Sequence, residues 1–159
     1  MASDYFLKLD GIKGESQDAK HKDEIELISF SWGVTNGGTI GGGGGAAGKA
    51  TFADFEVAMP VNRSSPQIFL KCANGAHIKE GTLAVRKSGG KNQVEYLKFK
   101  FNDLLITGYE ENGNVEDDRP LDVVRFNFAK FEMTHSTQAQ SGTTTSETVG
   151  WDLKQNQKI

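Results

Sequence analysis

The regular alternation of apolar and polar residues through most of this chain is its most restrictive feature. Phe55, Val57 and Met59 alternate with charged or small neighbours, and segments 94–103 and 124–133 repeat the pattern with further aromatic residues. Alternation of this kind, bounded by turn residues, is typical of β-strands that bury one face. The sequence therefore predicts a mainly β protein whose strands cover a hydrophobic core.

Segment 24–34 is expected to form one such strand with two different faces. Ser29 and Ser31 lie on the face opposite the large apolar residues, so that face is small and polar. The residues expected on the apolar face are Ile28, Phe30, Trp32 and Val34.

In segment 124–133 the alternation changes phase, because Phe128 is followed by Phe131 and not by a residue two positions on. A slip of one residue is what a β-bulge produces where a strand bends. We therefore expect a bulge near Ala129 or Lys130.

One short helix is predicted at about 65–75, within SSPQIFLKCANG. Ser64 or Ser65 can serve as the N-cap, Pro66 suits the first helical position, and Gly75 provides a left-handed C-terminal stop. The residues that share one helical face, and are expected to pack on the sheet, are Ile68, Phe69 and Cys72.

These elements predict a two-sheet antiparallel β-barrel or sandwich with one short flanking α-helix and a long Gly-rich loop at 36–49. A chain of 159 residues forms a single domain, here taken as 1–159, and is long enough to bury a core without a metal or a cofactor. The lone Cys72 allows no internal disulfide framework and is expected to act as a small hydrophobe.

Glycine is concentrated in one loop, where eight of the 19 glycines lie between Gly37 and Gly48. Its stretch 43–50, GGGAAGKA, nearly matches a phosphate-binding P-loop. However, Ala50 stands where that motif needs a hydroxyl for Mg²⁺, and a strand pattern follows where a helix is required. Nucleotide binding is therefore not expected, and the loop is either mobile or ordered by a neighbouring molecule.

No pattern in the sequence predicts an enzyme. His21, His77 and His135 lack partners at metal-ligand spacing and are expected on the surface or in turns. The acidic segment YEENGNVEDDR matches no EF-hand loop, so a solvated hairpin connection is favoured over a calcium site. No catalytic residue, metal site or cofactor is expected.

Charge and hydropathy exclude two classes of partner. The 18 basic and 21 acidic residues give a net charge of -3, and the basic residues form no cluster, which argues against nucleic acid. No apolar stretch reaches the ~18 residues of a membrane span, and the N-terminus does not resemble a signal peptide. We expect a soluble chain that, if it is exported, leaves the cell in folded form.

Several segments together resemble one known family. These are IKGESQDAKHKDEIELISFSWG at 12–33, GGGGGAAGK at 41–49, SPQIFLKCANGAH at 65–77, RKSGGKNQVEYL at 86–97, EDDRPLDVVRFNFAKFEM at 116–133 and VGWDLKQN at 149–156. In this order they resemble Hcp, the haemolysin co-regulated protein of type VI secretion systems. The resemblance covers nearly the whole chain.

The resemblance implies a structural role. Hcp proteins form homohexameric rings that stack into an inner tube, with a spike protein at its tip, and a contractile sheath expels the tube from the cytoplasm. Small secreted effectors ride in the ring lumen. By position, Ser29 and Ser31 become candidate lumen residues. The candidate ring-stacking residues are Asn36, Gly41, Gly42, Gly43, Gly44, Gly45, Ala46, Ala47, Gly48 and Lys49.

Two other classes of function remain open at the level of sequence. A stand-alone β-sandwich that binds a ligand would need an aromatic surface platform, for which Tyr109 is the candidate. A hydrolase would have to use the acidic segment, with Asp117 and Asp118 as its carboxylates. The mass of the protein in solution separates a ring from a monomeric module.

Overall fold

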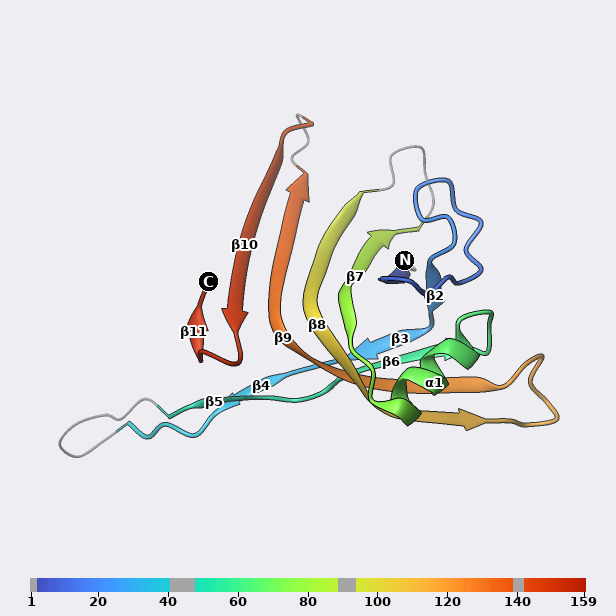
Figure 1. Ribbon diagram of the computed structural model, residues 1–159. Coiled ribbons are helices and arrows are strands. Elements are labelled where there is room, and N and C mark those ends of the chain that lie inside the picture. Colours follow the sequence, from blue (N-terminus) through green and yellow to red (C-terminus); the bar gives the residue numbers. More distant parts are fainter. Residues whose placement is uncertain (1–2, 41–47, 89–93, 139–141) are drawn as a thin grey trace.

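The computed structural model describes residues 3–40, 48–88, 94–138 and 142–159 (Figure 1). In these residues the chain forms one helix and eleven strands. The strands are β1 (Ser3–Leu9), β2 (Ile25–Leu27), β3 (Ser29–Ser31), β4 (Val34–Asn36), β5 (Ala50–Phe52), β6 (Phe55–Pro60), β7 (Ile78–Lys87), β8 (Glu95–Asn112), β9 (Leu121–Gln138), β10 (Thr144–Asp152) and β11 (Gln157–Lys158), and the helix is α1 (Ser65–Asn74). The expected mainly β class with one short helix is confirmed.

Two layers share the long strands β8 and β9, of 18 residues each. The first layer has the order β11-β10-β9-β8-β7-β1-β2, and β6 and β3 extend a second layer from the other half of β9. Figure 1 shows β8 and β9 bending so that each runs through both layers. All pairings are antiparallel, but the described strands do not close into a barrel.

The bend is built without the bulge expected in β9. In both strands the spacing between successive buried residues grows from two to three at the bend. This occurs from Phe101 to Leu104 in β8 and from Phe128 to Phe131 in β9. The register between the strands is unchanged there, and Asp103, opposite Ala129, has a left-handed φ of 57°. The register shift lies instead in β8, between Ile106 and Gly108. Both strands therefore turn together, and the expected bulge near Ala129 or Lys130 is wrong.

Segment 24–34 forms more than one strand, because the chain crosses between the layers at Ile28. Leu27 still pairs with Tyr5 in the first layer, whereas Ser29 pairs with Ala58 of β6 in the second. Ile28 and Ser29 are both exposed at the crossing. The next inward-facing residue after Leu27 is therefore Phe30, three positions on and not two. Ile28 and Val34, both expected on the apolar face, are each 55% exposed.

An aromatic cluster fills the space between the layers. Phe55, which is fully buried, lies at its centre, with ring centroids of Phe101, Phe126 and Phe99 at 5.0, 5.2 and 5.4 Å. Phe30 and Trp32 cover the same ring at 5.7 and 5.6 Å. Alternate residues of β6, β8 and β9 supply this core, as the alternation predicted.

Helix α1 lies against one side of the layers and is ten residues long. Gly75 ends it in the left-handed region, with φ of 67°, as expected, but the Ser64 side chain makes no N-cap hydrogen bond. Ile68 is fully buried and Cys72 is half-buried, whereas Phe69 is 58% exposed and meets the sheet through Tyr109 of β8, so it packs there only in part. No helix in the described part of the chain is long and apolar enough to span a membrane.

Candidate assembly surfaces

The outer face of the second layer is small and polar, and it carries both predicted lumen residues. Ser29 and Ser31 are exposed on β3, while Phe30 between them packs inward. The cross-strand partners on the outer face form one row of Ser31, Glu56, Arg125 and Gly108, and a second of Ser29, Ala58, Val123 and Glu110. The structure thus brings the two serines together on one surface.

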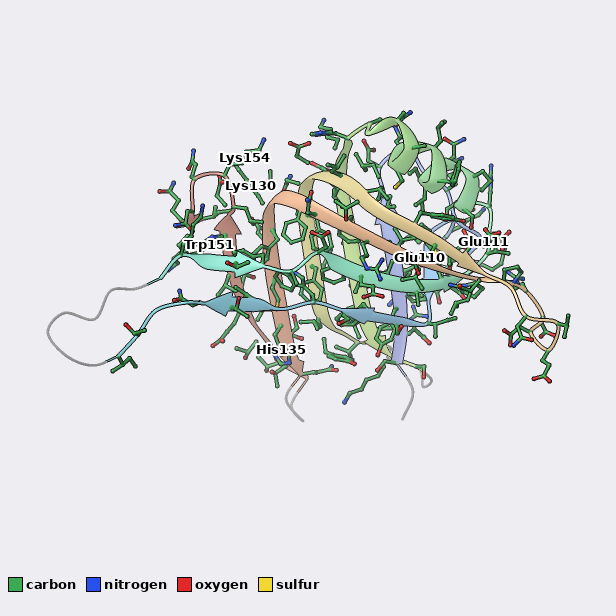
Figure 2. The ribbon with its side chains drawn as sticks, turned by 90° about the horizontal axis from the view of Figure 1, so that it is seen from below. Glu110, Glu111, Lys130, His135, Trp151 and Lys154 are labelled. Atoms are coloured by element: carbon green, nitrogen blue, oxygen red, sulfur yellow. The ribbon has the colours of Figure 1, made fainter. Side chains whose placement is uncertain are left out.

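An arginine between two carboxylates lies beside these serines and was not found from the sequence. Nη2 of Arg125 is 3.6 Å from Glu56 Oε1, and its Nη1 is 3.5 Å from Glu110 Oε1. The three residues come from β9, β6 and β8, and Figure 2 shows Glu110 on this part of the sheet. We call the surface formed by Ser29, Ser31, Glu56, Glu110 and Arg125 the polar face.

The second layer has two open edges. Among the described strands, β3 pairs only with β6, and residues 105–112 of β8 pair only with β9. Backbone N–H and C=O groups along such edges are available to strands of another chain. The layer that carries the polar face therefore ends in an edge strand on both sides, and α1 lies beside the β8 edge, where Phe69 meets Tyr109.

Strands β4 and β5 form a separate two-stranded hairpin that projects from the body (Figure 1). At its far end Asn36 Nδ2 donates to the Gly48 carbonyl at 2.8 Å, and Asn36 Oδ1 accepts from the Gly38 N–H at 2.8 Å. A Cβ on Gly48 would lie 2.5 Å from Gly38 N, so the close approach of the two chain segments at this end of the hairpin requires glycine at position 48. Of the predicted stacking residues, 41–47 lie outside the described residues.

A cleft of about 510 Å³ separates this hairpin from β10. One wall consists of residues of β4 and β5, including Val34 and Phe52, and the other of Val149 and Trp151. Figure 2 shows Trp151 lying against the hairpin, and its ring centroid is 6.4 Å from that of Phe52. Both valines are more than half exposed, so apolar surface faces solvent inside the cleft. We call it the hairpin cleft.

His77 and His135 are exposed, as expected, whereas His21 is buried. His21 is 6% exposed, with Nδ1 2.9 Å from Glu24 Oε2 and Nε2 2.7 Å from Glu95 Oε1. It stacks on Phe6 and secures the long connection between β1 and β2. The sequence around His21 does not predict this burial, because one of its partners, Glu95, lies 74 residues away in the chain. Among the described residues, no group of three His, Cys, Asp or Glu residues could hold a metal ion.

The start of α1 covers a buried carboxylate. Ser65 Oγ donates to Asp122 Oδ2 at 2.5 Å, and the Tyr109 hydroxyl donates to Glu111 Oε2 at 2.9 Å. Burial raises the pKa of the Asp122 carboxyl, and burial also raises the pKa of Tyr109. Phe69 and Tyr109 meet edge to face at 5.7 Å beside a pocket of about 490 Å³. Tyr109 is therefore half covered and is not the open aromatic platform of a ligand-binding module.

The acidic segment forms the turn between β8 and β9, as expected for a hairpin connection. Asn112 pairs with Leu121, and Asp117 and Asp118 are exposed in the turn between them. The sequence after Lys49 continues as strand β5, so the helix that a P-loop requires does not follow the glycine run.

These features define the class of the protein: a two-layered antiparallel β protein with a projecting hairpin and a polar outer sheet face. A family model described as "Type VI secretion system effector, Hcp" matches residues 6–135. The chain is 35% identical over 159 residues to Protein hcp1 of Pseudomonas aeruginosa, and the match covers 98% of each chain.

Solved structures agree. Hcp1 from Salmonella typhimurium has a TM-score of 0.81 at 32% identity, covering 99% of this chain and all of that one. A structure described as that of a type six secretion system protein has a TM-score of 0.92 at 28% identity, with the same coverage. A type VI secretion system effector from Yersinia pestis has a TM-score of 0.78 at 34% identity, covering 94% and 100%. The chain belongs to the Hcp family of type VI secretion proteins, and the resemblance found in the sequence is confirmed.

Proposed function

We propose that this protein is a ring subunit of the type VI secretion tube and has no catalytic turnover. Six copies form a ring, rings stack through residues 36–49, and the lumen carries small secreted effectors. The tube is assembled in the cytoplasm inside a contractile sheath, with a spike protein at its tip, and is then expelled from the cell. The proposal needs neither a cofactor nor nucleic acid.

The observation that carries the proposal is the second layer, which combines two open edges with the polar face. A sheet open at both ends can join copies of itself head to tail, and such contacts close into a ring when the rotation allows. The polar face then lies on one side of all copies. The small Ser29 and Ser31 leave space there, and the charges of Arg125, Glu56 and Glu110 keep it wetted.

The solution mass tests the ring. Light scattering behind a sizing column is expected to give a particle of about six times 17.3 kDa, with a central hole in negative-stain images. A monomer at every concentration, including in the presence of type VI sheath and spike proteins, contradicts the ring. A monomer also favours the stand-alone ligand-binding module.

Removal of Gly41 to Gly45 tests the stacking role of the loop. We expect the shortened chain to form single rings of unchanged mass but fewer and shorter stacks, because the loop loses reach towards the next ring. Stack length in electron micrographs at matched protein concentration measures the effect. A chain in which Asp117 and Asp118, in the β8–β9 turn, are both changed to Asn serves as the stacking control. Stacks as long as those of the unmodified protein would remove the loop from the stacking contact.

A further inference from the structure

An apolar pocket lies at the β8 edge of the second layer, between that strand and the start of α1. Its volume is about 490 Å³, and its walls include Pro66 and Phe69 of α1 and Tyr109 of β8. Phe69 is 58% exposed, although its ring meets that of Tyr109 edge to face. The pocket therefore presents apolar surface to solvent beside a sheet edge. We call it the α1 pocket, and its other lining residues are Val61, Asn62, Ser65 and Glu111.

The opposite edge of the same layer carries an exposed isoleucine. Ile28 directly precedes β3, and its N–H donates to the Ala58 carbonyl at 2.8 Å, which fixes the backbone at this position. Ser29 lies on the polar face and Phe30 packs inward, so alternation turns Ile28 towards the inner side of the layer, on which α1 is bonded. Among the described strands β3 pairs only with β6, and Ile28 is 55% exposed at this free edge.

The isoleucine and the pocket lie at the same level along the strands. One cross-strand row runs from edge to edge of the layer and consists of Ser29, Ala58, Val123 and Glu110. Ile28 adjoins this row at β3, whereas Tyr109 and Glu111, which line the α1 pocket, flank its other end. Two copies placed side by side, without slip along their strands, therefore bring Ile28 of one copy to the α1 pocket of the other.

This contact runs in the direction of ring closure and not of stacking. The row crosses the strands, whereas the β4–β5 and β8–β9 hairpins project along them (Figure 1). Figure 2 shows α1 beyond β8 at one side of the second layer and β3 at the opposite side. A contact between these two different surfaces of identical chains is heterologous, which is the type that closes into rings. Both hairpins stay free to meet other rings.

We propose that Ile28 of each copy enters the α1 pocket of the next copy in the ring, where it covers Phe69 and Tyr109. The inference rests on the proposed ring and names a side-chain contact that joins its subunits. Association removes the exposed apolar surface of both partners from water, which favours the contact. The competing occupant is Ile40, which is exposed near the far end of the β4–β5 hairpin and reaches the pocket only from another ring.

Cysteine pairs test the contact in the full-length protein. In a Cys72→Ser background, Ile28→Cys combined with Phe69→Cys is expected to give, with a short bismaleimide, a ladder of covalent oligomers that ends at the hexamer. The pair is not joined within one chain, because three strand spacings, about 14 Å, separate β3 from β8. Val149→Cys combined with Phe69→Cys is the matched control and should remain monomeric on a denaturing gel. All three positions are exposed, so none of these changes disturbs the core.

The result also separates this inference from the proposed ring. A ring-sized particle whose Ile28–Phe69 pair does not cross-link overturns the contact and leaves the ring intact. A ladder from Ile40→Cys combined with Phe69→Cys, in place of the Ile28–Phe69 ladder, assigns the pocket to the hairpin of another ring and also overturns the contact. Monomeric parent protein that does not cross-link overturns both proposals.

Substitutions of Ile28 give an independent measure. Ile28→Asp should raise the subunit dissociation constant about tenfold or more, because the contact would then bury a carboxylate in an apolar pocket. Ile28→Val keeps the apolar contact and should leave the constant within about twofold of the parent value. Sedimentation velocity over a dilution series measures both variants. An Ile28→Asp variant that assembles as tightly as the parent protein contradicts the contact.

Discussion

Replacing Phe55 with alanine is expected to lower the free energy of unfolding by about 4 kcal/mol, within the range of phenylalanine truncations in well-packed cores. Its ring is fully buried and contacts aromatic rings from both layers, at centroid distances from 5.0 to 5.7 Å. Truncation leaves a cavity between the layers, which the surrounding rings cannot fill without leaving their rotamers. Urea unfolding at fixed protein concentration measures the loss, because assembly also stabilises the folded chain.

Phe69→Ala is the matched control for Phe55→Ala. The same side chain is removed, but from a position on α1 that is 58% exposed and contacts Tyr109. The expected loss is about 1 kcal/mol, the value of one aromatic pair. Equal losses for the two variants would mean that the aromatic cluster around Phe55 does not form the core.

The strands and the helix could be predicted because their signals are local. Alternation in β6, β8 and β9 identifies the buried face directly, and Pro66 and Gly75 mark the ends of α1. The same reasoning wrongly predicted that Ile28 is buried. Ile28 continues the apolar alternation of Phe30 and Trp32, but the chain changes layer at this residue. Local alternation cannot reveal that crossing, because the pairing partner changes from β1 to β6.

The candidate surfaces were predictable only where they depend on residue size and composition. Ser29 and Ser31 stood out as small polar residues opposite large apolar ones, and the structure places both on an exposed face. Arg125, Glu56 and Glu110 carry no such signal, since their association depends on the register of three strands. The hairpin cleft depends in the same way on the distance between β4–β5 and β10.

Long-range pairing also explains why the buried charge of Arg86 was missed. The Arg86 side chain in β7 is 4% exposed, and its Nη1 donates to Asp18 Oδ1 at 3.0 Å, 68 residues earlier in the chain. Nη2 also donates to Asp18, and Nε donates to Asp4 at 3.2 Å. The guanidinium covers the Phe6 ring at 4.7 Å, and that ring stacks on His21 at 4.3 Å. Arg86 thus fastens the 10–24 connection to the first layer.

Replacing Arg86 with methionine should lower the free energy of unfolding at neutral pH by more than the loss of a surface ion pair, because the guanidinium is 4% exposed and donates to two aspartates. Methionine keeps much of the apolar stem but leaves the two aspartates without their donor. Arg125→Met is the control, because Arg125 is 39% exposed and its two ion pairs are worth less than about 1 kcal/mol. Chemical unfolding of both variants at one protein concentration gives the comparison.

The pH dependence of stability distinguishes a lost ion pair from lost packing at Arg86. Hydrogen bonds from Arg86, followed by one from the Lys20 N–H, lower the pKa of Asp18 from 3.8 to about 2. A carboxyl with a depressed pKa stabilises the fold above its unfolded pKa, and this contribution is lost as pH falls through the folded one. Unmodified protein should therefore lose stability between about pH 4 and pH 2 through Asp18. The Arg86→Met variant should already lack most of the Asp18 contribution at neutral pH. Its free energy of unfolding should therefore change less than that of the unmodified protein between about pH 4 and pH 2. An unchanged acid profile in Arg86→Met would show that Arg86 acts through packing on Phe6 and not through Asp18.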